Sequence, residues 1–246
     1  MSDIHLSIVI PAYNEEKRIQ KTLEEVDKYL RRQKYSYEII VVSDGSKDKT
    51  GEVVLELTSK IKNLKLVDNK VNHGKGFVVR QGLSQAKGKY RLFTDADNST
   101  SIDQTEKMWP VLEKGFDIVI GSRDIKGAVL DPPQPWIRNV LLGEGFKLFR
   151  KLVIGLWGLE DTQCGFKIFK AEAVKSVFLK CKINRFAFDP EILVVAQRMG
   201  YKVKEVPVYW KNDPESKVKF KNIIKMSLDL FKIRINLIKG VYGKKT

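Results

Sequence analysis

Short apolar runs alternate with longer amphipathic segments over the first half of the chain. The apolar runs, rich in β-branched residues, span 6–13, 37–46, 63–69, 90–97 and 116–123. Between them, segments 14–33, 49–61, 76–88 and 103–114 carry apolar residues at helical spacing, and acids in the first turn of 14–33 precede bases in its last. Strands that alternate with helices predict right-handed βαβ units. The pattern therefore predicts an α/β fold: one Rossmann-like domain whose mostly parallel sheet has helices on both faces.

The second half of the chain does not follow this alternation. Residues 127–136, rich in Pro, are expected to form a loop, and residues 137–159 are amphipathic but interrupted by glycines. Residues 161–174 suggest a hairpin or turn that leads into a helix, and residues 201–210 suggest a late strand. We expect residues 1–212 to form one domain and residues 213–246 to add a basic amphipathic helix.

Polar residues gather where the predicted strands end. Ligands of open α/β sheets bind beyond the carboxyl ends of the strands, and parallel strands place these ends at one edge. At that edge we expect Tyr13, Asn14, Glu15, Ser43, Asp44, Asp95, Asp97, Ser122 and Arg123. The topology thus predicts a single site built from residues that lie far apart in the sequence.

Asp95 and Asp97 follow the apolar part of the fourth predicted strand. Residues two apart in extended chain point to the same side, so the two carboxylates should converge and should need a cation between them. Mg²⁺ or Mn²⁺ prefers carboxylate oxygens and often shares them with substrate phosphates. The alternative is a strand-ending turn, because Asp and Asn favour turns. Their position in the βαβ series favours the metal site.

Two loops near the predicted edge carry further polar groups. Asp44 could hydrogen-bond a base or a ribose, while Ser46 or Asp48 could cap the following helix. In the sequence NHGKG, at 72–76, Lys75 is the candidate for a phosphate contact, and His73 is a weak candidate for a third metal ligand.

Asp189 lies in the segment RFAFDPEIL, at 185–193. One interpretation is structural, with Asp189 as the helix N-cap, Pro190 at the first helical position and Glu191 in the first turn. A catalytic carboxylate is the other interpretation, and the spacing does not separate the two.

Charge and cysteine content narrow the class of protein. With 45 basic and 30 acidic residues among 246, the net charge is +15, which indicates an anionic partner such as nucleic acid, anionic lipid or a phosphorylated substrate. No recognition-helix, RRM-like or zinc-finger pattern supports the nucleic acid. Cys164 and Cys181 are the only cysteines and indicate reduced thiols in a cytoplasmic protein. No stretch approaches the ~20 apolar residues of a membrane span.

Residues 220–239 form an amphipathic pattern when projected as a helix. Lys221, Lys225, Lys232 and Lys239 fall on one narrow stripe, and a broad apolar arc opposite contains Arg234. The segment could be a helix that packs on the domain and leaves its lysines in solvent. Alternatively, it could lie at a membrane surface with its basic side chains among anionic headgroups, so that membrane contact would be peripheral.

Several motifs occur in the order typical of glycosyltransferase family 2. They are SIVIPAYNEEKRI (7–19), SDGSKDKT (43–50), NHGKGFVVRQG (72–82), DADNST (95–100), GSR (121–123), DTQCGFKIF (161–169), RFAFDPE (185–191) and ESK (215–217). The chain resembles most closely the polyprenyl-phosphate sugar transferases of that family, in particular the dolichyl-phosphate β-glucosyltransferases. The resemblance covers roughly residues 5 to 239 and implies a catalytic domain of the GT-A type.

The resemblance also implies roles for individual residues. A nucleotide-sugar pocket would be formed by Pro11, Ala12, Tyr13, Glu15, Asp44, Lys75, Asp95, Ala96 and Asp97. Within it Asp44 would contact uracil, Lys75 the diphosphate, and Asp95 and Asp97 the Mg²⁺ or Mn²⁺. The phosphate of the acceptor would be bound by Arg123, Arg138, Ser216 and Lys217. Asp97, Arg123, Arg138, Asp189 and Lys217 are the catalytic candidates.

The implied reaction is an inverting transfer of glucose from UDP-glucose to a polyprenyl phosphate, on the cytoplasmic face of a membrane. A phosphate monoester is largely dianionic at neutral pH and hardly needs a general base. Mannose or GlcNAc could replace glucose on the same lipid phosphate. A saccharide or protein acceptor would instead make Asp189 an essential base. A nucleic-acid-binding module is the remote alternative.

Overall fold

A computed structural model describes residues 4–133, 144–212 and 220–243, with the backbone alone for residues 220–223. Its centre is a seven-stranded sheet in the order β3-β2-β1-β4-β7-β5-β8. The strands of this sheet are β1 (Leu6–Ala12), β2 (Tyr37–Asp44), β3 (Leu64–Asn69), β4 (Tyr90–Thr94), β5 (Ile118–Ser122), β7 (Phe166–Lys170) and β8 (Val203–Pro207). The α/β class and the mostly parallel sheet are confirmed.

Strand β7 is the exception to the parallel order. It lies between β4 and β5 and runs antiparallel to both. The expectation of a hairpin or turn missed this strand, whose Phe166, Ile168 and Phe169 are completely buried in the middle of the sheet. The helix expected to follow is present as α6 (Ala171–Lys180). Because β7 runs antiparallel, its first residue lies at the edge where β4 and β5 end, and the loop that precedes β7 therefore reaches that edge.

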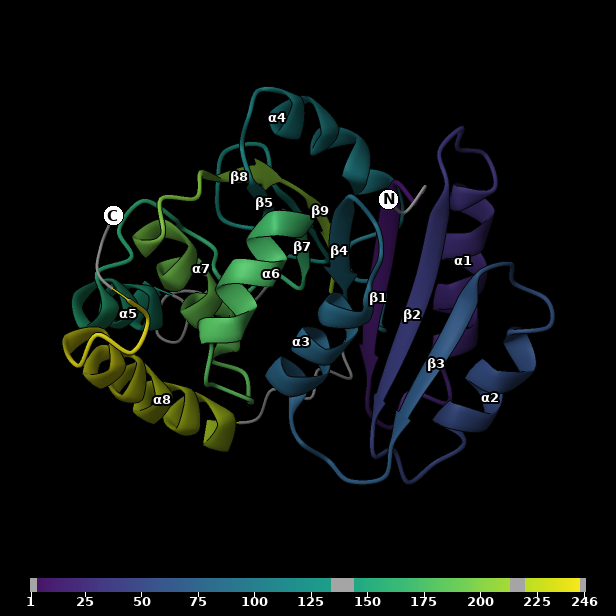
Figure 1. Cartoon of the computed structure of the whole chain (residues 1–246), viewed down its shortest axis with the longest axis horizontal. Helices are drawn as coiled ribbons and strands as arrows, with labels where there is room; N and C mark the ends of the chain where they lie inside the picture. The colour runs from purple at the N-terminus through teal and green to yellow at the C-terminus, as the bar shows by residue number, and fades with distance from the viewer. Residues whose placement is uncertain (1–3, 134–143, 213–219, 244–246) are drawn as a thin grey trace.

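Helices cover both faces of the sheet (Figure 1). They are α1 (Ile19–Leu30), α2 (Thr50–Leu57), α3 (Lys75–Gln85), η1 (Ile102–Lys107), α4 (Trp109–Glu113), α5 (Gly145–Ile154), α6 (Ala171–Lys180), α7 (Phe188–Arg198) and α8 (Phe220–Ile238). One core cluster packs α1 and α2 against the sheet, and a second packs α3, α6 and α7 against the opposite face. The expected two-sided layering is therefore confirmed.

Three local expectations were wrong. Helix α1 begins at Ile19 and has no acid in its first turn, because Glu16 serves the preceding loop, where its carboxylate accepts the backbone N–H of Lys49. The segment expected to be a loop contains β6 (Val129–Asp131), which pairs with β9 (Tyr209–Lys211) in a small parallel sheet. The single helix expected over 103–114 is divided into η1 and α4, with Pro110 near the start of the second.

The C-terminal helix α8 lies beside α5 (Figure 1). Leu230 and Ile233 of α8 are completely buried and belong to the same core cluster as α7. After α8, the hydroxyl of Tyr242 donates to Glu191 of α7 at 2.6 Å, which fastens the end of the described chain to the domain. Within the described ranges, no helix combines the length and the apolar character required to cross a membrane.

Candidate active site

Strands β1, β2, β4 and β5 all end at one edge of the sheet, as the parallel order requires. Ala12 at the end of β1 lies opposite Ser43 of β2, and Ser122 ends β5 opposite Pro207. The polar residues that follow these strands are thus brought to the same side of the molecule. The loop before β7 joins them there, because Phe166 pairs with Thr94, the residue before Asp95.

An ammonium group lies beside the acidic pair Asp95 and Asp97 at this edge and contacts Asp95. Nζ of Lys75, at the start of α3, lies 2.5 Å from Oδ1 of Asp95. Burial alone would lower the pKa of Lys75, but the neighbouring carboxylates of Asp95 and Asp189 raise it above its ordinary value. Burial raises the pKa of Asp97, and the charge of Asp95 raises it further. The premise of an extended chain was wrong, because β4 ends at Thr94 and residues 95–98 form the strand-ending turn, in which the Asn98 N–H donates to the Asp95 carbonyl. The two carboxylates are nevertheless close enough to repel each other.

Backbone packing fixes the position of these groups. The Asp95 N–H donates to the Gly165 carbonyl at 3.2 Å, and a β-carbon on Gly165 would collide with the Asp95 carboxylate. Gly74, which precedes Lys75, has φ of +103° and leaves no room for a side chain against the Asn184 carbonyl. Both glycines are required here, the first for a close approach and the second also for its left-handed backbone.

Asp189 forms a buried ion pair with Lys167. Nζ of Lys167 lies 2.5 Å from Oδ1 of Asp189 and also donates to the Cys164 carbonyl. Burial raises the pKa of Asp189, and the charges of Lys167 and Lys75 oppose that shift. The proposed N-cap role was wrong, because α7 begins at Phe188 with Ala187 as its N-cap. Its carboxylate is engaged by β7 instead.

Arg123 is held by Asp161 in a bidentate pair. The guanidinium donates through Nε to Oδ2 at 2.7 Å and through Nη2 to Oδ1 at 3.0 Å, and the Arg123 N–H donates to the same carboxylate. Burial alone would raise the Asp161 pKa, but the Arg123 guanidinium holds it well below its usual range. The guanidinium carbon of Arg123 also lies 4.7 Å from the ring centroid of Trp210. This geometry fixes the direction of Arg123.

The carboxylate of Asp44 organises the loop that leads to Lys75. It accepts the N–H of His73 at 2.7 Å, the N–H of Gly74 at 2.9 Å and Nδ2 of Asn72 at 2.9 Å. The His73 ring packs on Phe77, with centroids 4.4 Å apart. Asp44 is 3% exposed, so its carboxylate holds this loop from inside the protein.

The loop after β1 is hydrogen-bonded to the loop after β2. The N–H of Asn14 donates to Ser46, and the N–H of Glu15 donates to Thr50 at 2.8 Å. Of the two expected caps of α2, Asp48 makes the bond: its carboxylate accepts the N–H of Thr50, the first residue of the helix, at 3.0 Å. The N-cap position itself is Lys49, which makes no side-chain capping bond. Pro11 and Ala12 are the buried end of β1, and Tyr13 beyond them is partly exposed.

Ala96, between the two acids, is buried, and its carbonyl accepts the Thr22 hydroxyl at 2.7 Å. The structure thus brings Lys75, Asp95, Asp97 and Asp189 together as one electrostatic group. Three other predicted residues, Arg138, Ser216 and Lys217, lie outside the described residues.

Sequence reasoning missed two residues of this site, Lys167 and Asp161. Both lie in the motif DTQCGFKIF, which carried the resemblance without a role for either side chain. Lys167 is completely buried, although lysine side chains are almost never fully buried unless they are paired. The signal available in the sequence was an acid, Asp161, and a lysine, Lys167, on either side of the Cys164–Gly165 pair, with the lysine inside an apolar run.

An open α/β sheet with paired acids at the end of a central strand is the arrangement found in glycosyltransferases. The sequence profile described as Glycosyl transferase family 2 matches residues 7–178. The chain belongs to this family and is a glycosyltransferase.

Individual relatives place the chain more closely within the family. It is 40% identical over 249 residues to a dolichyl-phosphate beta-glucosyltransferase of Trichomonas vaginalis. This alignment covers 95% of this chain and 74% of the relative. The human dolichyl-phosphate beta-glucosyltransferase is 35% identical over 258 residues, covering 96% of this chain and 77% of that protein. The chain is similar to both of these proteins over nearly its whole length.

Solved structures support the fold. Mannosyl-3-phosphoglycerate synthase from Rubrobacter xylanophilus matches with a TM-score of 0.70 at 18% identity, covering 96% of this chain and 74% of that chain. Glucosyl-3-phosphoglycerate synthase from Mycobacterium tuberculosis, in complex with Mn²⁺, UDP and phosphoglyceric acid, matches with a TM-score of 0.68 at 17% identity. That match covers 99% of this chain and 80% of the other. The fold is accordingly of the GT-A type.

Proposed function

We propose that this glycosyltransferase transfers glucose from UDP-glucose to a polyprenyl phosphate such as dolichyl phosphate, with inversion at the anomeric carbon. The observation that carries the proposal is the acidic pair Asp95 and Asp97, with Lys75 beside it, in a chain similar over nearly its full length to dolichyl-phosphate beta-glucosyltransferases. The names of these relatives support the sugar and the acceptor. The UDP bound in a structural neighbour supports the nucleotide.

The carboxylates fit a hard divalent cation. Among the residues that the structure describes, no group of three or more His, Cys, Asp and Glu side chains is placed to hold a metal ion. Phosphate oxygens and water would therefore complete a coordination shell begun by Asp95 and Asp97. Mg²⁺ or Mn²⁺ held there would neutralise the diphosphate of the leaving UDP, in keeping with the Mn²⁺ of the neighbouring synthase structure.

Lys75 would bind the donor, and Asp44 would hold the loop that positions Lys75. Asp44 holds the backbone of residues 72–74, and this loop sets the start of α3 where Lys75 stands. With Asp95 as a ligand of the cation, the ammonium of Lys75 would be available to contact the diphosphate. Lys75 would thereby stabilise the negative charge that develops on the leaving group.

Arg123 would bind phosphate, as would Arg138, Ser216 and Lys217. The nucleophile is a phosphate oxygen that is already ionised at neutral pH, so it needs cations more than it needs a base. Arg123 is directed by Asp161 and Trp210 and loses little freedom when an anion binds. Asp189, paired with Lys167, would then position cations and take no proton.

A second candidate acceptor is the hydroxyl of a saccharide or a protein. The observation in its favour is the raised pKa of Asp189, which suits a general base. Such an acceptor would make Asp189 essential for the chemical step. Mannose or GlcNAc from their own nucleotide sugars would be variants of the same reaction.

The test is a transfer assay that pairs UDP- and GDP-sugars with a short-chain, water-soluble polyprenyl phosphate and with a free saccharide. We expect glucose to pass from UDP-glucose to the lipid phosphate, with a β-linked product by NMR. Asp189→Asn should reduce the rate of this reaction and leave part of it. Transfer to the saccharide alone, abolished by Asp189→Asn at an unchanged melting temperature, would establish the hydroxyl acceptor instead.

A further inference from the structure

Helix α8 has apolar side chains on two opposite faces. Met226, Leu230 and Ile233 face the domain and are at most 6% exposed. The outer face carries a row spaced four and three residues apart, each between 49% and 72% exposed: Ile224, Leu228, Phe231, Ile235 and Ile238. At ~100° per residue this row is centred on the side opposite the buried one. The broad apolar arc seen in the sequence is thus divided into a packed side and an uncovered side.

Helix α5 continues the uncovered side. The ring of Phe149 meets the ring of Phe231 edge-on, with centroids 5.5 Å apart. Leu148 and Leu152, which flank Phe149 on α5, are 55% and 63% exposed. We call the outer row of α8 together with Leu148 and Leu152 the α5–α8 apolar surface. Soluble proteins rarely leave a contiguous apolar patch of this kind in water, and such patches mark a contact with a partner or a membrane.

Basic side chains border this surface. On α8, Lys225, Lys232 and Lys239 project along one side of the outer row, and Arg234 projects along the other. Asp229 is the one acid between residues 220 and 243. It is 9% exposed and lies 2.7 Å from Lys232, so it faces the domain. The rim of the apolar surface is therefore positive.

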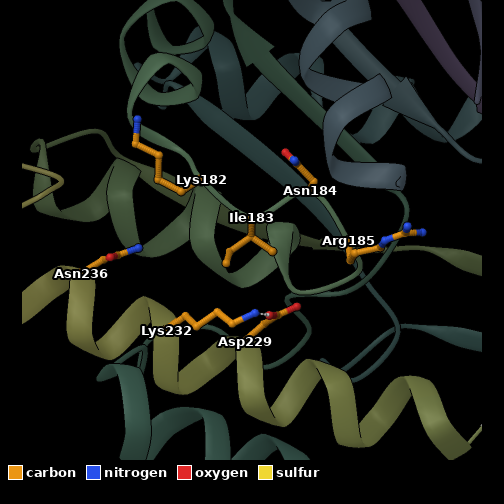
Figure 2. A pocket seen from close by; sticks show the side chains of 7 residues that line it. All are labelled: Lys182, Ile183, Asn184, Arg185, Asp229, Lys232 and Asn236. Carbon is orange, nitrogen blue, oxygen red and sulfur yellow. Dashed lines mark hydrogen bonds and ion pairs between the residues drawn. The ribbon is translucent and has the colours of Figure 1, made fainter. Parts of the chain in front are cut away.

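A cavity of about 380 Å³ opens at the lysine side of α8 (Figure 2). Lys182 and Arg185 approach it from the loop before α7, Lys232 approaches it from α8, and Asn184 and Asn236 add amide groups. Asp229, the ion-pair partner of Lys232, is the one acid in the lining, so the three basic side chains outnumber it. Lys232 is shared by this basic cavity and by the rim of the apolar surface. An anion of phosphate size would meet several donors there.

The basic cavity adjoins the donor loop. Arg185 donates to the side-chain oxygen of Asn72 at 2.8 Å, and Asn72 in turn donates to Asp44. On α8, Met226 contacts Gln163 of the loop before β7. A partner or membrane in contact with α8 would consequently lie close to the sheet edge that carries the candidate active site.

We propose that the α5–α8 apolar surface docks on an anionic lipid bilayer, with the basic cavity holding a phosphate headgroup; the inference rests on the proposed lipid acceptor. The apolar row would enter the boundary between headgroups and acyl chains, and the basic rim would remain at headgroup level. A second copy of the chain fits less well. A two-fold contact through this surface would bring the lysines of both copies together.

The first experiment measures flotation of the full chain with vesicles of phosphatidylcholine, alone or with about a third phosphatidylserine. Wild type should float with the anionic vesicles at low salt and detach as salt increases. Leu228→Gln/Ile235→Gln should reduce the partition coefficient by about tenfold or more. The matched control is Leu55→Gln/Leu179→Gln, on α2 and α6, since these leucines are 63% and 80% exposed; it should float like wild type.

The second experiment tests the basic cavity. Lys182→Gln/Lys232→Gln should weaken binding to anionic vesicles between about fivefold and about thirtyfold at low salt. Lys60→Gln/Lys62→Gln, on the exposed segment before β3, should leave it unchanged. Equal losses in both variants would mean that net charge alone drives binding, and would overturn the headgroup site.

The outcomes separate docking from the reaction. With a short soluble polyprenyl phosphate, Leu228→Gln/Ile235→Gln should transfer glucose at the wild-type rate, and with a long-chain acceptor in vesicles it should fail. Wild type that ignores vesicles yet glucosylates the short acceptor would overturn the docking surface and leave the proposed function intact. A wild-type dimer by light scattering that Leu228→Gln/Ile235→Gln converts to a monomer would assign the surface to self-association.

Discussion

Lys167 and Asp189 face each other inside the protein, with Nζ 2.5 Å from Oδ1 and side chains that are 0% and 6% exposed. The pair joins the antiparallel strand β7 to the first turn of α7. It also lies within electrostatic range of Lys75 and Asp95. An ion pair so deeply placed costs much to break from one side, because the remaining charge is left without a partner.

Lys167→Met should therefore lower the free energy of unfolding by about 3–5 kcal/mol, measured by urea denaturation. The matched variant Lys167→Met/Asp189→Asn removes both charges and should recover most of that loss. Transfer activity should stay low in the double variant if the pair positions Lys75. Full activity in the double variant would assign the pair to stability alone.

Asp97→Asn should raise the free energy of unfolding of the metal-free protein at neutral pH, measured by urea denaturation. Burial and Asp95 raise the Asp97 pKa in the folded state, so its ionised form opposes folding at pH 7. That cost disappears as pH falls through the raised folded pKa and then the unfolded pKa. The difference between variant and wild type should shrink towards about pH 4, and asparagine can keep the bond from the Ser99 N–H.

The same variant should lose transfer activity and Mn²⁺ binding, the latter followed by electron paramagnetic resonance. Wild-type activity should vanish with EDTA and return with Mg²⁺ or Mn²⁺. Full activity in EDTA would rule out the metal role of Asp95 and Asp97.

Lys75→Gln should have opposite effects on the two ligands. Removing the ammonium 2.5 Å from Asp95 leaves the acidic pair without its internal cation, so Mn²⁺ should bind the nucleotide-free protein more tightly. UDP should bind less tightly, because a cation near its diphosphate is lost. Calorimetric titration measures both affinities, and Lys70→Gln, whose partner is the exposed Asp68, is the control. Unchanged UDP affinity would remove Lys75 from the donor site.

Asp161→Asn should destabilise the protein by about 3–5 kcal/mol at pH 7, because the Arg123 guanidinium loses its buried partner. Arg123 holds the Asp161 pKa well below its usual range, so this stabilisation is present above the unfolded pKa of about 4. It is lost as pH falls further, towards the folded pKa. The stability gap between variant and wild type should accordingly close in acid, measured by thermal melts over a pH series.

The sequence predicted those parts of the fold that local patterns encode. Buried β-branched runs and amphipathic segments indicated the parallel strands and their helices, and the parallel order placed Asp44, Asp95 and Arg123 at one edge. Strand β7 was missed because its apolar length suits a turn or a strand equally, and its pairing with β4 and β5 is a long-range choice. The start of α1 was misplaced because Glu16 serves a loop contact in place of the first helical turn.

Within the site, single residues were easier to predict than their partners. The motif placed Asp95 and Asp97 at the end of β4, although a turn and not an extended strand holds the two residues there. Lys75 pairs with Asp95 through a loop whose course depends on Asp44 and Gly74. Asp189 was singled out, but its partner Lys167 lies on a strand that sequence periodicity did not reveal. Which charge meets which depends on tertiary packing.

The place of β7 in the sheet has a consequence for biosynthesis. When residue 94 has left the ribosome, β3, β2, β1 and β4 can already pair in their final order. Strand β5, made next, has no neighbour in the sheet until residues 166–170 emerge and bridge it to β4. Until then the edge of β4 is open and can recruit strands from other chains. Nascent chains stalled between residues 94 and 166 should depend most on chaperones.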